Sequence, residues 1–421
     1  MLKLLMEIIF EIFYYIFKYK DYDKFIISLI RKIGDYNIIF VKIFQWIRIN
    51  NNNYFITQKI ENEINSFTNN TPYTDSDIDY KSLLQIYKIA EENSDVFQLD
   101  SIEPINTGSI SLVFKGKLNN KDVAIKILRK NIKEKIEKGI CLLINLENIL
   151  YYIPILNYYV STKIFENNRD HIFNQINFIN ESENIIMFYK KFKKNKKVLI
   201  PNVYDNYTKI NNNVILMDYI NGKYLYELDS NELDEFFTPF YNFIANSIFY
   251  KKIFHSDLHQ GNILFFKETI GDEVIYKVGI IDFGMITKLE TNEIDFIYLW
   301  INGIFNENFK DMLEYLKNPN NISIIFDNYE KINNCIEILM KLYDEKKIFH
   351  EFENAEVLID NIYSFLNILK KFNCKISSRY DFFILSLIPI FTVLIKLGPG
   401  IKKRNIVREN LQKMQSNKLL D

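Results

Sequence analysis

The spacing of apolar residues predicts a change of structure near residue 96. Before that point apolar residues recur at helical spacing, interrupted by the loop-forming segments 50–53 and 68–77. From Phe97 onward, short runs rich in β-branched residues alternate with the turn sequences "NTGS" and "NNKD". We therefore expect a helical segment followed by a small antiparallel sheet.

The rest of the chain has mostly helical spacing. Helices are predicted from about residue 131 to 193, and "LIPNVYDNY" with "NNVILMDYINGKYL" then predicts a hairpin-like pair of strands. After Glu232 the pattern is helical except around "NILFF" and "YKVGIIDFG". A strand-rich lobe followed by a helical lobe is the order of a protein kinase. We expect an α+β, protein-kinase-like two-lobe fold with an N-terminal helical extension, divided into residues 1–95, 96–225 and 226–421.

Two apolar segments lie towards the ends of the chain. Residues 1–20 form an apolar run with a narrow polar stripe that includes Glu7 and Lys18, which favours a helix packed on the protein or lying on a membrane surface. Residues 382–395 are short for a membrane span and contain Pro389. A buried, kinked helix near the C-terminus is the expectation.

Composition narrows the functional classes. Of the 421 residues 48% are hydrophobic, enough for a large core, and the formal net charge of -1 gives no indication of a nucleic-acid partner. The three cysteines are far apart and form no C-x-x-C motif. Neither a disulfide framework nor a zinc knuckle is indicated, and a reducing compartment, with the chain cytoplasmic or peripheral to a membrane, is the natural inference.

The run "DVAIKIL" places Lys126 on a predicted strand in a V-A-I-K context. Strand alternation points Val123 and Ile125 to one face, and Ala124 and Lys126 to the other. Alanine leaves room for an adenine ring, and the lysine can neutralise the α- and β-phosphates of ATP. Taken alone, an ordinary exposed strand lysine is the alternative.

A candidate phosphate loop precedes this strand. In "NTGSISLVF" the residues follow the order of a glycine-rich loop, with Gly108 at the position of its second glycine. Backbone amides in such a turn can hold a phosphate without the outer glycines. The residues assigned to the loop are Asn106, Thr107, Gly108, Ser109 and Val113. Alone, they would predict a plain hairpin turn.

A candidate hinge lies in "VILMDYINGKYL", an apolar strand that ends in a polar Asn-Gly turn. Met217 would lie behind the adenine ring. The backbone of Asp218, Tyr219 and Ile220 would face the edge of that ring. A hairpin that binds no ligand is the alternative.

Two further motifs complete the phosphoryl-transfer pattern. "HSDLHQGN" contains H-x-D-x-x-x-x-N, with Asp257 and Asn262, and "IIDFG" contains Asp282 after a strand-like run. Asp257 would orient an acceptor hydroxyl, while Asn262 and Asp282 would hold Mg²⁺. Coincidence is improbable when all of these motifs occur in this order.

A metal site built on His255, Asp257 and His259 is the alternative for the same segment. Two histidines at i and i+4 can share a metal on a helix, but Gly261 and the β-rich run that follows disfavour a helix here. The remaining histidines are isolated, so no third ligand cluster supports a zinc site.

These motifs together resemble the UbiB-type atypical protein kinase family. "FHSDLHQGNIL", "PINTGSISLVFKGKL" and "VAIKILRKNI" carry the likeness, and His259 and Gly261 are part of it. The likeness runs from about residue 30 to about residue 400. It implies ATP and Mg²⁺ as cofactors, a helical extension over the active site, and a link to isoprenoid-quinone metabolism with a lipid or membrane partner. It also implies that Glu181 pairs with Lys126.

The chain departs from the family's regulatory motifs. The K-x-G-Q motif of the extension lies on Lys42 and Gln45, but Phe44 replaces its glycine. Gln175 and Asn177 stand where the family has two acidic residues, so a role that needs their charge would be lost. A plain amphipathic helix is the alternative for the Lys42 segment.

The expected activity is that of an ATP- and Mg²⁺-dependent phosphotransferase or ATPase. An extension that covers the cleft would disfavour a protein substrate. A nucleotide-binding pseudokinase scaffold is one alternative, favoured by the altered regulatory positions. A small-molecule kinase of the aminoglycoside or choline type is another, because its H-x-D-x-x-x-x-N loop is similar.

Overall fold

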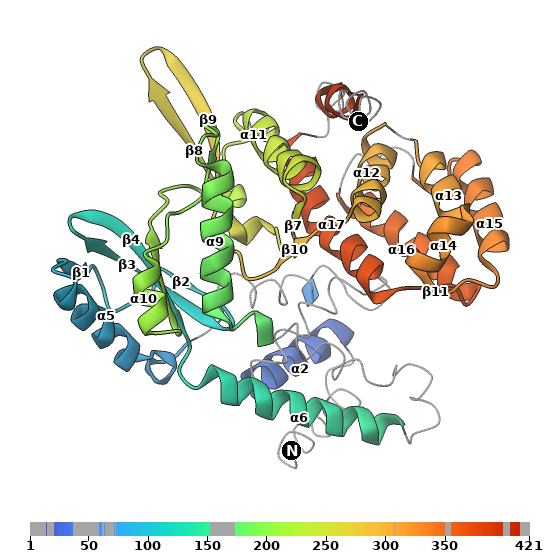
Figure 1. Ribbon diagram of the computed structural model, residues 1–421. Coiled ribbons are helices and arrows are strands. Elements are labelled where there is room, and N and C mark those ends of the chain that lie inside the picture. The colour runs from blue at the N-terminus through green and yellow to red at the C-terminus, as the bar shows by residue number, and fades with distance from the viewer. Residues whose placement is uncertain are drawn as a thin grey trace. The chain divides into compact units, whose positions relative to one another are not determined.

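The structure is a computed structural model of the 421-residue chain. It describes residues 14, 21–36, 59–60, 63, 71, 73–151, 173–306, 308–349, 355–398 and 405–412. The chain divides into two compact units: unit 1 consists of Met1–Met187 and Pro201–Ile220, and unit 2 of Phe188–Ile200 and Asn221–Asp421. Each unit has its own sheet and helices (Figure 1).

Unit 1 contains an antiparallel five-stranded sheet in the order β1-β3-β4-β6, with β2 pairing to β3. The strands are β1 (Phe97–Leu99), β2 (Asn106–Thr107), β3 (Ser111–Leu118), β4 (Lys121–Leu128) and β6 (Val214–Asp218). Asn119 and Asn120 link β3 to β4 with φ angles of 50° and 65°. Asparagine tolerates this left-handed conformation, which a tight two-residue hairpin requires. The antiparallel sheet expected after Phe97 is confirmed.

One face of the unit 1 sheet packs into a hydrophobic core. Val123, Ile125 and Ile127 of β4 lie in one buried cluster with Leu83 and Ile86 of the helix α5. Successive side chains of a strand point to opposite faces, so Lys126 faces away from this cluster. The helices of unit 1 are α2 (Tyr22–Tyr36), the 3₁₀ turn η2 (Asp75–Asp77), α5 (Tyr80–Glu92), α6 (Ile132–Tyr151), α10 (Asp205–Ile210) and the first part of α9 (Phe178–Phe192).

The hairpin-like pair predicted between residues 198 and 225 is only partly right. Val203 forms an isolated antiparallel bridge with Met217, as a hairpin would. The short helix α10 lies between these two residues, and β5 (Val198–Leu199) pairs instead with a strand of unit 2 in parallel. Local propensity does not reveal a six-residue helix whose Tyr207 is fully buried, because that burial comes from tertiary packing.

Unit 2 is mainly helical. Its helices include η3 (Leu225–Glu227), α11 (Leu233–Ala245), η4 (Asn246–Tyr250), η5 (Gln260–Asn262), α12 (Thr291–Asn306), α13 (Lys310–Lys317), α14 (Pro319–Ile325), α15 (Ile332–Asp344), α16 (Ala355–Lys371) and α17 (Ser378–Leu397). Its strands are β5, β7 (Ile253–His255), β8 (Ile263–Ile270), β9 (Glu273–Ile280), β10 (Ile286–Lys288), β11 (Phe326–Asn328) and β12 (Lys375–Ile376). The strands form the small sheets β5-β9-β8, β10-β7 and β11-β12. The strands expected around "NILFF" and "YKVGIIDFG" are therefore present.

The helix α17 is longer than the apolar run that predicted it, at 20 residues with Pro389 inside. Among the described residues it is the one helix whose length and composition would allow it to cross a membrane, but 67% of its most apolar stretch is buried in the protein. That burial is typical of a core helix, as expected for this segment. The apolar run at residues 1–20 lies outside the described residues except for Tyr14.

Candidate active site

An ion pair between Lys126 and Glu181 is the main feature of the candidate site residues in unit 1. The Lys126 Nζ atom lies 2.6 Å from the Glu181 Oε1 atom, and the two side chains are only 7% and 2% exposed. Lys126 Nζ also lies 5.4 Å from the centre of the Phe178 ring, a cation–π arrangement. A charged lysine is therefore held in place on the sheet face opposite the core.

The helix α9 places Glu181 one turn from its N-terminus. Asn177 precedes the helix, and its side-chain Oδ1 accepts a hydrogen bond from the Asn180 amide at 3.1 Å. This is an N-cap interaction, which satisfies an amide that has no partner within the helix. Gln175 lies in the turn before Asn177. A neutral amide at residue 177 thus has a structural role that does not need the charge of an acid.

The candidate phosphate loop is a tight turn between β2 and β3. The Gly108 amide donates to the Ser111 carbonyl at 2.9 Å, and Asn106 pairs with Val113 in the ladder. In the described part of the chain, the amides of Ser109 and of the residue after it, Ile110, donate no hydrogen bond. Adjacent amides in a turn are able to bind an anion.

The candidate hinge lies at the end of β6. Met217 is buried and pairs with Ala124 across the β4–β6 ladder. The Asp218 carboxylate accepts from Lys121 Nζ at 2.7 Å and from the Tyr204 hydroxyl at 3.0 Å, so its side chain is occupied by protein partners.

The hinge amides differ in their bonding. The Asp218 amide donates to the Asn202 carbonyl, and the Tyr219 amide donates to the Asp122 carbonyl. Within the described residues the Ile220 amide has no acceptor. Ile220 is therefore the hinge residue whose N–H is available to a ligand.

The segment between β7 and β8 carries the candidate site residues of unit 2. The Asn262 side-chain Nδ2 donates to the Asp257 carbonyl at 2.8 Å, which fixes the loop between them. The Asn262 carbonyl accepts from the Ile281 amide at 3.2 Å, next to Asp282. Asn262 is buried, whereas the Asp257 side chain is 40% exposed and can meet a substrate. The structure thus brings Asp257 and Asn262 together and ties them to the segment that contains Asp282.

His255 forms hydrogen bonds with both of these segments. Its Nε2 donates to the Asp282 carbonyl at 2.7 Å, and its Nδ1 accepts from the Asp257 amide at 3.4 Å. An amide can only donate, so the ring proton is assigned to Nε2. Burial lowers the pKa of His255 below its usual value, and this favours the neutral ring that these bonds require. His255 is therefore a support of the loop.

His259 is a second support. Its Nδ1 accepts from the Gly261 amide at 3.1 Å, and its Nε2 lies 3.9 Å from Asp257 Oδ1. Among the residues that the structure describes, no group of three or more His, Cys, Asp or Glu side chains could hold a metal ion. The two histidines contact loop backbone, which agrees with the kinase-type interpretation of this segment.

Asp282 and Phe283 lie where "IIDFG" follows β9. The Asp282 Oδ1 atom accepts from the Gly284 amide at 3.1 Å. The Phe283 ring is fully buried, with its centre 4.9 Å from that of Phe188 and 5.5 Å from that of His255. Phe283 thus packs on His255 and on the part of α9 that belongs to unit 2.

Two expected residues lie outside the described part of the chain, and two residues near the phosphate turn were not expected. Lys42 and Gln45 lie outside the described residues. Arg129 and Asp77 were not among the expected residues, and they form a partly buried ion pair beside the Gly108 turn. The available signal was an arginine directly after the apolar strand that carries Lys126.

Comparison with known proteins identifies the family to which the chain is similar. The ABC1 atypical kinase-like domain model matches residues 76–316, more than half of the chain. A probable protein kinase UbiB of Blochmanniella pennsylvanica (strain BPEN) is 29% identical over 229 residues, covering 50% of this chain and 39% of that protein. An AarF domain-containing kinase 1 of Drosophila melanogaster is 24% identical over 239 residues, covering 54% and 45%. The chain thus spans less than half the length of these relatives.

A solved structure similar to this chain is that of the Rv3197–erythromycin complex from Mycobacterium tuberculosis, with 13% identity and a TM-score of 0.46. The match covers 71% of this chain and 74% of the other. The expected α+β, kinase-like fold and the resemblance of the motifs agree with the family model. The chain belongs to the ABC1 atypical kinase-like family.

Proposed function

We propose that this chain is an ATP- and Mg²⁺-dependent phosphotransferase or ATPase. The observation that carries the proposal is the buried ion pair of Lys126 and Glu181. A buried ion pair is a poor source of stability, because desolvating both charges offsets their attraction. Its position on the sheet face opposite the core is better explained by a ligand that brings negative charge. Triphosphate is such a ligand.

In unit 1 the proposed contacts follow from the site geometry. Lys126, oriented by Glu181, contacts the α- and β-phosphates. The turn of Asn106, Thr107, Gly108 and Ser109 supplies amide donors to the phosphates. Ala124, Val113 and Met217 form the apolar surface for the adenine ring, and the Ile220 amide donates to its edge.

In unit 2 the proposed metal ligands are Asn262 and Asp282. The Asn262 Nδ2 atom is bonded to the Asp257 carbonyl, and no described residue donates to its Oδ1. That oxygen and the Asp282 carboxylate are the oxygen donors that Mg²⁺ prefers, so the residues fit the ion. When bound, Mg²⁺ neutralises charge on the phosphates. Asp257 orients the acceptor hydroxyl, or a water, and accepts its proton.

The proposal assigns the unit 1 residues to the nucleotide and the unit 2 residues to Mg²⁺ and the acceptor. Family membership also leads us to propose isoprenoid lipid or quinone metabolism as the setting. The proposal disfavours a protein substrate, on the expectation that the N-terminal extension covers the site.

Nucleotide-dependent thermal stability tests the binding part of the proposal. A ligand that binds only the folded chain raises its melting temperature. Mg-ATP is expected to raise the Tm of the wild type by several degrees, and to raise that of Asp282→Ala much less. Asp257→Ala serves as the matched control, because Asp257 acts on the acceptor, and its shift should equal that of the wild type. If Mg-ATP stabilises neither the wild type nor the variants, the proposal is wrong.

A further inference from the structure

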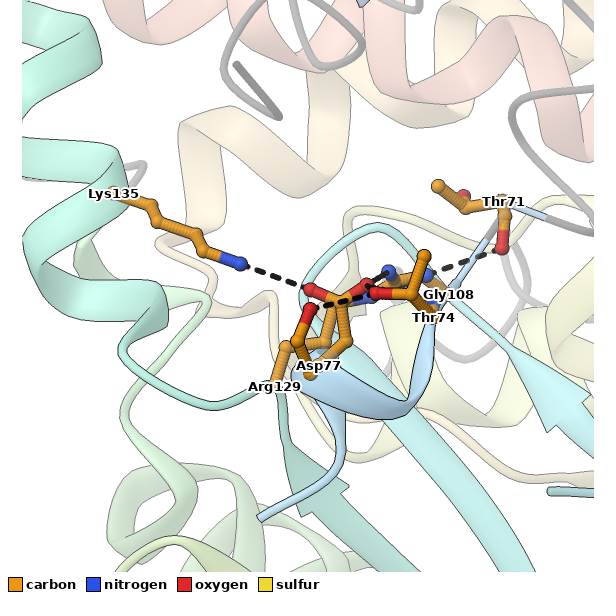
Figure 2. Close-up of polar contacts among 7 residues, drawn as sticks. Thr71, Thr74, Asp77, Gly108, Arg129 and Lys135 are labelled. Atoms are coloured by element: carbon orange, nitrogen blue, oxygen red, sulfur yellow. Dashed lines mark hydrogen bonds and ion pairs between the residues drawn. The ribbon is translucent and has the colours of Figure 1, made fainter. Parts of the chain in front are cut away.

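Arg129 is buried at the centre of a polar network in unit 1. Figure 2 shows its guanidinium between Thr71, Asp77 and Gly108. Arg129 Nε donates to the Gly108 carbonyl at 3.0 Å, Nη1 to Asp77 Oδ2 at 3.3 Å, and Nη2 to the Thr71 carbonyl at 3.1 Å. The side chain is 4% exposed. Its orientation is thus fixed by three partners from three segments of the chain.

Asp77 keeps the guanidinium in this position. Its carboxylate also accepts from the Thr74 amide at 3.0 Å and from Lys135 Nζ on α6 at 2.9 Å. Burial alone would raise the pKa of Asp77, but these hydrogen bonds and the nearby positive charges of Lys135 and Arg129 lower it below its usual value. Asp77 is therefore ionised at neutral pH, and the charge-assisted bond to Arg129 is present there.

Arg129 binds two carbonyl groups of the candidate phosphate turn. Its side chain binds the Gly108 carbonyl, and its backbone amide donates to the Ile110 carbonyl at 2.9 Å. In a trans peptide unit the C=O and the following N–H point in opposite directions. Holding the Gly108 oxygen toward Arg129 therefore turns the Ser109 N–H away from it. This is one of the two turn amides that have no acceptor in the described part of the chain.

The direction of this peptide unit matters because Gly108 has little conformational restriction of its own. Without a Cβ atom, a glycine can adopt backbone conformations in which the adjacent peptide is flipped. A flipped unit would present a carbonyl oxygen to a phosphate where the present one presents an N–H. A carbonyl oxygen repels an anion, whereas an N–H group binds it.

We propose that Arg129 is a positioning residue for the phosphates of the nucleotide. It fixes the orientation of the Gly108–Ser109 peptide so that this peptide presents the Ser109 N–H to the phosphates. The inference rests on the proposed function, since it needs a phosphate-bearing ligand. Arg129 itself does not touch the nucleotide. Through Thr71, whose amide donates to the Thr107 carbonyl at 2.9 Å, Arg129 also ties the segment that leads into the family domain to the same turn.

The test compares ligands with and without phosphates. Arg129→Lys keeps the positive charge beside Asp77, but a lysine cannot reproduce the planar guanidinium contacts with Gly108 and Thr71. We expect Mg-ATP and Mg-ADP to bind the variant about tenfold more weakly, as for loss of a hydrogen bond that involves a charged group. Adenosine should bind the variant and the wild type equally. Calorimetric titration of the full chain measures all three affinities.

Lys135→Met is the matched control. It removes the other cation that donates to Asp77, and it leaves the three Arg129 contacts in place, so the affinities for ATP and adenosine should stay as in the wild type. If Arg129→Lys does not fold, Asp77→Asn replaces it, with a smaller loss expected for ATP and none for adenosine. An equal loss for adenosine and ATP would reduce Arg129 to a fold-stabilising residue and overturn the inference.

Amide hydrogen exchange on the nucleotide-free chain separates this inference from the proposed function. The Gly108 amide, which is bonded to Ser111, should exchange faster in Arg129→Lys than in the wild type and at an unchanged rate in Lys135→Met. A wild type that binds no Mg-ATP would overturn both the proposed function and the positioning role. A wild type that binds Mg-ATP, with unchanged exchange and affinity in Arg129→Lys, would overturn the positioning role alone.

Discussion

At the scale of single residues, the ion pair of Lys126 and Glu181 fixes the position of a buried charge but contributes little to stability. Both side chains are withdrawn from water, and each is the other's counter-ion at 2.6 Å. Removing one partner of such a pair leaves an uncompensated buried charge, whereas replacing both with apolar groups restores a neutral interior. The pair therefore has an energetic signature that distinguishes a functional ion pair from one that stabilises the fold.

We predict that Glu181→Leu lowers the free energy of unfolding by about 3 kcal/mol, the usual cost of leaving a buried charge unpaired. The double variant Lys126→Met/Glu181→Leu should recover most of this loss, because no buried charge remains. Urea denaturation of the three chains measures the difference. A double variant as unstable as Glu181→Leu alone would mean that the pair is retained for stability.

Arg129 shows which residues a sequence pattern can reveal and which it cannot. Lys126 could be predicted because strand alternation and the V-A-I-K context are both local. The role of Arg129 depends on Asp77 and Thr71, which are remote in the sequence and meet it only in the folded chain. No spacing rule predicts a hydrogen bond between the Arg129 side chain and the Gly108 carbonyl, which lies on the other side of the β3–β4 hairpin.

At the scale of elements, α9 carries candidate-site and packing residues in both units. Its first part, in unit 1, carries Glu181, and its last part, in unit 2, carries Phe188. The two residues are close to two helical turns apart, so they lie on nearly the same side of the helix. The Phe188 ring packs on Phe283, next to Asp282, with 4.9 Å between ring centres. The helix thus carries both the ion-pair partner of Lys126 and a ring that packs next to Asp282.

We expect Phe188→Ala to lower the free energy of unfolding by about 3 kcal/mol, as for other buried phenylalanines. It should also speed hydrogen exchange at the Gly284 amide, because Phe283 loses its support. Phe192→Ala is the matched control: Phe192 is buried on the same helix and packs on Phe188 and Phe243. It should destabilise unit 2 similarly without changing exchange at Gly284 selectively. The same exchange pattern in both variants would argue against a specific role for Phe188.

Elements also differ in how far the sequence determines them. The β3–β4 hairpin could be predicted from "NNKD", since Asn119 and Asn120 tolerate the positive φ that its turn needs. The helix α10 could not, because "DNYTKI" is too short to show helical periodicity. The sequence pattern there indicated strands, and the structure retains only the bridge between Val203 and Met217.

At the scale of the whole molecule, the order of the units agrees with the pattern of the sequence. A strand-rich unit comes before a helical one, with the Lys126 group in the first and the Asp257 group in the second. This order and the motifs were enough to indicate the family, because each motif is short and contiguous. The partition of α9 between the units, in contrast, depends on packing that a one-dimensional pattern does not contain.

The central claim is that the chain transfers the terminal phosphoryl group of ATP and that Asp257 takes part in this step. ATP turnover by the wild type and by Asp257→Asn, measured alongside the affinity of each for Mg-ATP, tests it most directly. We predict that the wild type produces ADP, and that Asp257→Asn loses at least about a hundredfold in rate while binding Mg-ATP as the wild type does. An unchanged rate in Asp257→Asn, or a wild type that binds Mg-ATP without producing ADP, would contradict the claim.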